Sequence, residues 1–265
     1  MSDVRSADGT LIAFETVGTG PAVILVDGAM CYRDAGPMRA VARLLAPHHT
    51  VVLYDRRGRG ASGDADRFSV QCEIDDVNAL IGAIGGSAAL FGMSSGGAVA
   101  CLAAAALGSA VTRLAVFEPP YMPESARPAA AAYTEELTAA LAQGDADRAV
   151  SAFLTRTGAP KDAIERMRQS PAWPGMTQIA KTLAYDDAAM GDSSIPAAAA
   201  TIGVPTLALA GGDSPDFMRW GARQLAEAIP GAAYDVLDDQ GHDVDPAALA
   251  ARLSSFLLGN GQRFT

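Results

Sequence analysis

Short runs of apolar residues, separated by stretches with helical spacing, constrain most strongly what this chain can fold into. The runs do not alternate with polar residues, which is typical of strands covered on both faces in a parallel sheet. Helical segments such as "PMRAVARLLA" and "DFMRWGARQLAEAI" lie between them and would supply the crossover connections that parallel neighbours need. The runs are "AVILV" (22–26), "TVVLY" (50–54), "AALFG" (88–92), "RLAVF" (113–117), "TLALA" (206–210) and "AYDVL" (233–237).

Two segments depart from this alternation. At the N-terminus, "VRSADGTLIAFETVG" alternates apolar and polar residues on both sides of Asp8-Gly9, a dipeptide that favours a tight turn between antiparallel strands. Between residues 121 and 204 the spacing is helical, with glycines and prolines between the helical pieces. We therefore predict an α/β fold with a doubly wound, mostly parallel sheet and an antiparallel N-terminal hairpin. Residues 1–120 and 205–265 would form the core, and residues 121–204 an all-helical cap.

Charge and composition exclude several classes of protein. The 265 residues carry a formal net charge of −10, and such a surface repels nucleic acid and anionic lipid. No apolar stretch is long enough for a membrane span, so we expect a cytoplasmic protein that acts on a small-molecule substrate. The three cysteines are widely spaced and form no CxxC pattern, which argues against a disulfide framework or a zinc site. No metal or cofactor is expected, and the oligomeric state stays open.

The stretch "FGMSSGGAVA" (91–100) lies where a predicted strand ends and a helix begins. A residue at so sharp a turn has a strained backbone, and the positions two before and two after it must be small. Gly92 and Gly96 satisfy this requirement for Ser94, whereas a turn centred on Ser95 would place Met93 at a tight position. The stretch therefore predicts Ser94 as a nucleophile, and the alternative is a glycine-rich turn without chemistry.

A serine nucleophile needs a base that takes its proton and a third group that orients the base. The chain contains three histidines. His48 and His49 precede the strand at 50–54 and so belong to its amino end. His242 follows the last strand and reaches the carboxyl edge, where the chemistry of such sheets collects. Position in the sheet therefore selects His242 as the base.

Two carboxylates are candidates for the third group. Asp213 follows the strand at 206–210 after two glycines, and Glu118 ends the strand at 113–117. Both come at the carboxyl edge of the sheet. We predict Asp213 as the acid that accepts the Nδ1 proton of His242, with Glu118 as the alternative.

The chain order Ser94, Asp213, His242, together with the Gly-x-Ser-x-Gly turn and the strand pattern, resembles the α/β-hydrolase family. "VILVDG" is similar to its third strand and oxyanion turn, and "YDRRGRGASG" (54–63) to its Asp-x-Arg-Gly-x-Gly-x-Ser segment. The helical stretch after residue 120 is similar to its cap. The resemblance covers nearly the whole chain and implies a serine hydrolase with a helical cap.

The resemblance also implies an oxyanion hole made of the backbone N–H groups of Ser95 and Ala29. Many members of the family have His-Gly where this chain has Asp27-Gly28. A carboxylate that pointed at the oxyanion would work against the reaction. We expect the Asp27 side chain to turn away and to be hydrogen-bonded to an arginine of "DRRGR".

Several side chains next to the predicted catalytic loops are candidates for substrate contacts, namely Met30, Met93 and Tyr121. The arginines of "RRGRG" are expected to be structural, tied to neighbouring carboxylates. Asp186 and Asp187 are interpreted as surface charges.

Together these features predict an enzyme that cleaves an ester, lactone or related carbonyl bond of a small, largely apolar molecule through an acyl-enzyme on Ser94. A perhydrolase, or a tailoring enzyme such as a cyclase, a lyase or a carbon–carbon bond hydrolase, would use a similar triad. A small-molecule receptor derived from a hydrolase would keep the site without turnover. The sequence leaves these alternatives and the natural substrate open.

Overall fold

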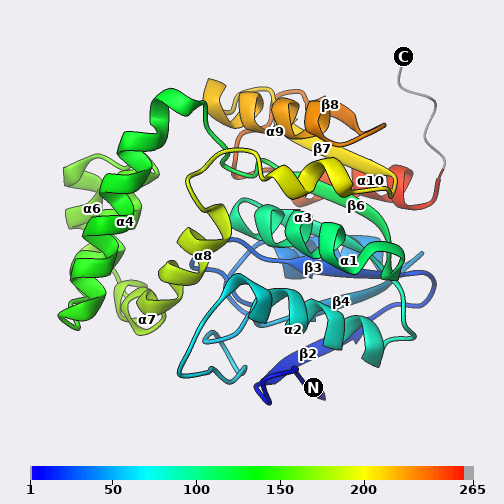
Figure 1. The fold of residues 1–265 in the computed structure, drawn as a ribbon, viewed down its shortest axis with the longest axis horizontal. Helices are drawn as coiled ribbons and strands as arrows, with labels where there is room; N and C mark the ends of the chain where they lie inside the picture. The colour runs from blue at the N-terminus through cyan, green and yellow to red at the C-terminus, as the bar shows by residue number, and fades with distance from the viewer. Residues whose placement is uncertain (1, 260–265) are drawn as a thin grey trace.

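The computed structural model describes residues 2–259, which form one eight-stranded sheet with helices on both faces (Figure 1). The strand order is β1-β2-β4-β3-β5-β6-β7-β8. β1 and β2 are antiparallel to their neighbours, and all other pairs are parallel. The predicted fold class is confirmed. The strands are β1 (Ser2–Arg5), β2 (Leu11–Val17), β3 (Ala22–Val26), β4 (Thr50–Tyr54), β5 (Ala88–Met93), β6 (Val111–Phe117), β7 (Thr206–Gly211) and β8 (Ala233–Leu237).

Two layers of helices enclose the sheet. Successive strand residues point to opposite faces, so in β5 Leu90 packs with the apolar residues of one helical layer and Phe91 with those of the other. Both side chains are fully buried, as expected for an uninterrupted apolar strand. One layer consists of α2 (Val70–Ala83), α3 (Ser95–Leu107) and α9 (Asp216–Ala228), and the other of α1 (Met38–Leu45) and α10 (Pro246–Leu257).

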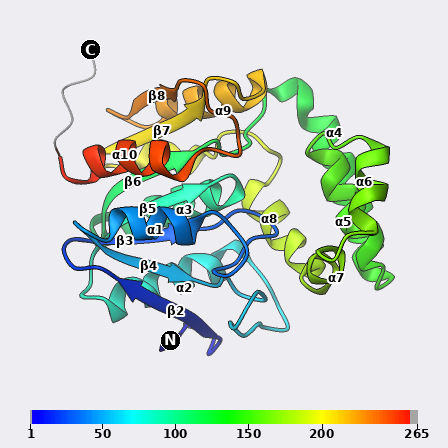
Figure 2. The same cartoon turned by 180° about the vertical axis from the view of Figure 1, so that it is seen from behind.

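Between β6 and β7 the chain forms a group of helices, residues 124–201, that we call the helical insertion. Figures 1 and 2 show it beside one end of the sheet, with α8 next to the core and the other labelled helices further out. It contains an apolar cluster of its own that includes Leu137, Val150 and Trp173. Its helices are α4 (Arg127–Ala142), α5 (Ala146–Arg156), α6 (Lys161–Arg168), α7 (Trp173–Gln178) and α8 (Leu183–Met190), with 3-10 turns at Glu124–Ala126, Ala180–Thr182 and Ala197–Thr201.

Buried arginines fix the loop after β4 to α2. Arg56 donates to Glu73 at 2.5 and 3.0 Å, and Arg57 donates to Asp76 at 2.7 and 2.8 Å. Each pair is bidentate, which is the strongest geometry for a guanidinium and a carboxylate. The structural role predicted for "RRGRG" is therefore confirmed.

The structure also gives two simpler findings. No helix within residues 2–259 is long and apolar enough to cross a membrane. The cysteines are free, and Cys101 is buried in α3, whereas Cys31 and Cys72 are partly exposed.

Candidate active site

Ser94 lies on a strained turn between β5 and α3. Its backbone angles are φ 54° and ψ −131°, a conformation that residues with side chains rarely adopt and that often marks functional sites. A Cβ atom on Gly92 would come within 3.0 Å of the Gly96 backbone, and one on Gly96 within 3.0 Å of the Val26 backbone. The chain can make this turn only because both positions are glycine, and the turn is centred on Ser94.

Glu118 and His242 form a hydrogen bond of 2.7 Å between Oε2 and Nδ1. Glu118 follows β6 directly, is fully buried and has a left-handed backbone with φ 48°. Its other carboxylate oxygen accepts a 2.7 Å bond from the N–H of Gly211, at the end of β7. A carboxylate held in this way orients the imidazole, with the proton on Nδ1 and with Nε2 able to accept another.

Asp213 does not occupy this position. It lies in the loop after β7 with its side chain exposed, and its N–H donates to the Gln240 carbonyl at 2.8 Å. The prediction that Asp213 bonds to His242 is therefore wrong, and the alternative, Glu118, makes the contact. The reason is geometric: Glu118 ends β6, the neighbour of β5, and its longer side chain spans the distance to the ring that arrives after β8.

The loop after β3 approaches Ser94 closely. A Cβ atom on Gly28 would lie 3.1 Å from Ser94 Cβ and 3.7 Å from Ser94 Oγ. Arg59 fixes this loop by donating to the Gly28 carbonyl at 2.6 Å. Ala29 is the next residue of the loop, while Ser95 begins α3 on the other side of Ser94, where the first N–H groups of a helix have no acceptor within it. Both flanks of Ser94 are thus formed by backbone.

Asp27 does not make the contact that the sequence predicts. Its side chain is 3% exposed, and Oδ1 has no hydrogen-bond partner within residues 2–259. Arg56 donates instead to the Asp27 backbone carbonyl, at 3.1 Å. Burial raises the pKa of the Asp27 carboxyl to about 7, although the charges of Arg59 and Arg56 oppose the shift. The prediction of a hydrogen bond between an arginine and the Asp27 side chain is therefore wrong. Asp27 lines the cavity, and its carboxyl is neutral in mildly acidic solution.

Asp186 is buried and joins α8 to the core, so its interpretation as a surface charge is wrong. Its Oδ1 accepts from Ser95 Oγ at 2.8 Å and from Arg56 at 2.7 Å, and its Oδ2 accepts from Arg59 at 2.5 Å. Burial acts to raise the pKa of this carboxyl, but the two guanidinium groups outweigh burial, and the pKa stays below its ordinary value. The signal in the sequence was the excess of arginines in "RRGRG", since buried guanidinium groups require carboxylate partners.

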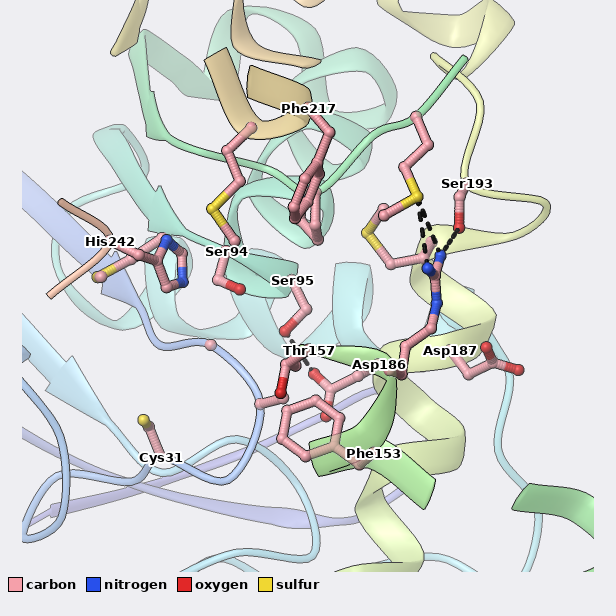
Figure 3. Close-up of a pocket in the computed structure, with 18 of the residues that line it drawn as sticks. Cys31, Ser94, Ser95, Phe153, Thr157, Asp186, Asp187, Ser193, Phe217 and His242 are labelled. Atoms are coloured by element: carbon pink, nitrogen blue, oxygen red, sulfur yellow. Dashed lines mark hydrogen bonds between the residues drawn. The ribbon is translucent and has the colours of Figure 1, made fainter. Parts of the chain in front are cut away.

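A cavity of about 630 Å³ lies between the core and the helical insertion, with Ser94 and His242 in its wall (Figure 3). The close-up shows both side chains on the same side of the cavity as the end of the sheet, with residues of the insertion opposite. The volume suits a small molecule. Most of the remaining wall is apolar and includes Pro37, Met122, Phe153, Met190, Phe217, Met218 and Val244.

The predicted contact residues divide into two groups. Ala29, Ser95 and Met93 line the cavity. Met30 instead packs against the apolar cluster of the helical insertion, and Tyr121 is buried in the core. Met30 and Tyr121 are therefore absent from the wall as far as residues 2–259 show, because both side chains pack against other apolar residues instead.

Sequence reasoning missed the polar residues that the helical insertion contributes to the wall. Arg156 and Thr157 come from the end of α5, and Ser193 from the loop after α8. Helical spacing identifies an apolar face, but it does not distinguish a face that packs from one that lines a cavity. These residues carried no motif that could have selected them.

A serine on a strained strand-to-helix turn and a histidine held by a buried carboxylate, both at the carboxyl edge of a mostly parallel sheet, define the architecture of an α/β hydrolase. Residues 20–252 match the model of the alpha/beta hydrolase family. The chain belongs to this family.

The chain is similar to three proteins described as hydrolases. An alpha/beta hydrolase from Sphaerobacter thermophilus DSM 20745 is 48% identical with a TM-score of 0.88, covering 97% of this chain and 100% of that one. A hydrolase from Pseudomonas aeruginosa PA01 shares the fold, with 24% identity, a TM-score of 0.74 and 97% of each chain covered. The uncharacterized hydrolase YraK of Bacillus subtilis (strain 168) is 37% identical over 95 residues, or 34% of each chain. The chain thus matches about a third of YraK, and these names give a class without a substrate.

Proposed function

We propose that the protein is a serine hydrolase that cleaves an ester, lactone or related carbonyl bond of a small molecule through an acyl-enzyme on Ser94. The observation that carries the proposal is the 2.7 Å bond between Glu118 and His242. It orients the imidazole in the wall of the cavity that also contains Ser94. The strained backbone of Ser94 supports the same conclusion, because such strain persists where a side chain must be presented to a ligand.

In the acylation step, Ser94 Oγ attacks the substrate carbonyl carbon while His242 Nε2 takes the hydroxyl proton. The buried carboxylate of Glu118 stabilises the imidazolium that forms. When the tetrahedral intermediate collapses, the bond to the leaving group breaks and His242 returns the proton to that group. A water molecule then attacks the acyl-enzyme, with His242 again as base, so that a carboxylic acid leaves and the serine is restored.

The N–H groups of Ser95 and Ala29 are the proposed oxyanion donors. A preorganised donor of this kind typically contributes about 3 kcal/mol to transition-state stabilisation. Ser95 is the first residue of α3, so the positive end of the helix dipole adds to the field at the oxyanion. The arginine bond to the Gly28 carbonyl keeps the second donor in place.

The helical insertion acts as the cap in this proposal. It supplies the wall opposite Ser94, and by covering the cavity it excludes bulk water, which strengthens every electrostatic interaction inside. The apolar residues of the wall favour a substrate with a hydrocarbon body.

Labelling with a fluorophosphonate tests the nucleophile. Intact mass should rise by one adduct, and peptide mapping should place the adduct on Ser94. The Ser94→Ala variant should take no label and give no burst of p-nitrophenol from p-nitrophenyl acetate. Ser95→Ala is the matched control and should still be labelled at Ser94. An adduct on another residue, or labelling of Ser94→Ala, would contradict the proposal, and labelled Ser94 without any turnover would favour the receptor alternative.

A further inference from the structure

Arg156 ends α5 and lies in the wall of the cavity. Its guanidinium donates to Met122 Sδ at 3.3 and 3.4 Å and to Ser193 Oγ at 3.4 Å. A thioether is a weak acceptor and a hydroxyl carries no charge. Within residues 2–259, Arg156 forms no ion pair at 4.0 Å or less. The guanidinium therefore faces the cavity without a carboxylate.

The buried arginines of the core are paired differently. Arg33, Arg56, Arg57 and Arg59 each bind a carboxylate at 2.8 Å or less. A guanidinium that is partly removed from water loses solvation, and a carboxylate compensates for the loss. Arg156 is only half-buried and lacks such a carboxylate in the described part of the chain, so its guanidinium in the cavity wall is available to a carboxylate of a ligand.

Neither of the two acidic residues of α8 that line the cavity forms an ion pair with Arg156 within residues 2–259. Asp186 is engaged by Arg56 and Arg59. Asp187 interacts with Arg156 only through space and shares a hydrogen bond with Thr134, while burial raises the pKa of its carboxyl. Asp187 is thus the more easily protonated of the two.

Ser193 provides a second, independent observation. Its backbone is left-handed, with φ 65°, although it is not a glycine, and the residue is buried. Its carbonyl accepts from the Met122 N–H at 2.8 Å, which holds the strained segment beside Arg156. Figure 3 shows Ser193 across the cavity from His242, with the dashed bonds to the guanidinium. A strained residue that presents a hydroxyl to a cavity is typical of a ligand contact.

We propose that Arg156 and Ser193 bind a carboxylate of the substrate, so that the enzyme acts on esters, lactones or related carbonyl compounds whose carboxylate is remote from the bond that is cleaved. This inference rests on the proposed function of Ser94. The planar guanidinium fits both oxygens of a carboxylate, which displaces Met122 Sδ, and the Ser193 hydroxyl adds a third donor. The apolar part of the wall between Ser94 and Arg156 suits a hydrocarbon chain that links the cleaved bond to the carboxylate.

Matched p-nitrophenyl esters test the inference. p-Nitrophenyl hydrogen succinate, glutarate and adipate carry a terminal carboxylate, and the corresponding neutral alkanoates of equal length lack it. For the best chain length, we expect a kcat/KM about 10- to 100-fold higher for the anionic ester, as for other hydrogen bonds to charged groups. In Arg156→Met the kcat/KM for the anionic ester should fall to about the value for the neutral ester, and Arg156→Lys should keep part of the preference because the charge remains.

The control for this series is Arg148→Met. Arg148 lies on the same helix, pairs with Glu136 and lies outside this cavity, so the variant should behave as the wild type. Equal preference in the wild type and in Arg156→Met would overturn the carboxylate site while leaving the hydrolase intact. If the wild type cleaves no ester of the series, binding of monomethyl glutarate to Ser94→Ala decides. Binding that Arg156→Met abolishes supports the site, and absence of binding overturns it, whereas a failure of Ser94 labelling refutes only the proposed function.

Discussion

The Ser95 hydroxyl donates a 2.8 Å hydrogen bond to Asp186, which lies 91 positions later in the helical insertion. The same carboxylate binds Arg56 and Arg59, and Arg59 also holds the Gly28 carbonyl. One side chain of the insertion is thereby connected to both backbone segments that flank Ser94. The helical insertion and the proposed oxyanion donors are coupled through a single buried ionic cluster.

Asp186→Asn should lower the free energy of unfolding by about 3–5 kcal/mol, the range for breaking a buried ion pair. Arg59 keeps its charge in this variant but loses its carboxylate. Urea denaturation of the two proteins at neutral pH measures the difference. Asp187→Asn is the matched control on the same helix turn and should cost much less, because burial already raises the pKa of that carboxyl. Equal losses in the two variants would show that the cluster does not depend on the charge of Asp186.

Glu118→Gln should reduce kcat on p-nitrophenyl acetate by about 10³- to 10⁴-fold, because an amide no longer fixes the tautomer of His242 or stabilises its charged form. Asp213→Asn should leave kcat nearly unchanged, since that side chain is exposed. Steady-state kinetics of both variants provide the comparison. A larger loss of kcat in Asp213→Asn than in Glu118→Gln would identify Asp213 as the acid and contradict the assignment of Glu118 from its 2.7 Å contact with His242.

The fold could be predicted well from the sequence because its signals are local. The run "AVILV" corresponds to β3 residue by residue, and "TVVLY" to β4. Uninterrupted apolar runs have few alternatives when helical segments flank them. The turn centred on Ser94 could be predicted equally well, because its steric requirement for glycine at positions 92 and 96 involves only five consecutive residues.

The rest of the site depends on contacts between distant segments. Glu118 and Asp213 both follow strands at the carboxyl edge of the sheet, and only the packing of the whole chain shows that Glu118 is the one that reaches His242. The helical spacing around Asp186 is indistinguishable from that of an exposed helix, although Asp186 lies on the buried face of α8 and bonds to three partners. Propensity and periodicity describe a segment, whereas these pairings follow from packing of the whole chain.

Asp27→Asn should remove a loss in the free energy of unfolding that the wild type shows as pH rises toward 7. The folded protein holds the Asp27 proton up to a pKa of about 7 because the carboxyl is buried, whereas the unfolded chain releases it near 4. Between these values the folded state binds more protons, so the stability contributed by the neutral acid falls as pH rises and is lost above 7. The neutral amide removes this loss, which amounts to roughly 4 kcal/mol for the full shift. Urea denaturation at pH 4.5, 6 and 8 should show a gain for the variant that grows with pH, and parallel curves for the two proteins would contradict the shift.

Gly96→Ala and Gly82→Ala form a matched pair that tests whether the turn at Ser94 is sterically required. Both glycines lie in helices, where alanine is favoured by about 1 kcal/mol. A Cβ atom on Gly82 meets nothing within 4 Å, whereas one on Gly96 would collide with the backbone of Val26 and Asp27. Gly82→Ala should therefore raise the free energy of unfolding by about 0.5–1 kcal/mol, and Gly96→Ala should lower it by about 1–3 kcal/mol as an overpacked site does.

Gly96→Ala should also react more slowly with the fluorophosphonate, because the first turn of α3 must shift away from Ser94. A Gly96→Ala protein as stable and as reactive as the wild type would mean that the turn tolerates a side chain at this position. The glycines at 92 and 96 would then not identify Ser94 as the nucleophile.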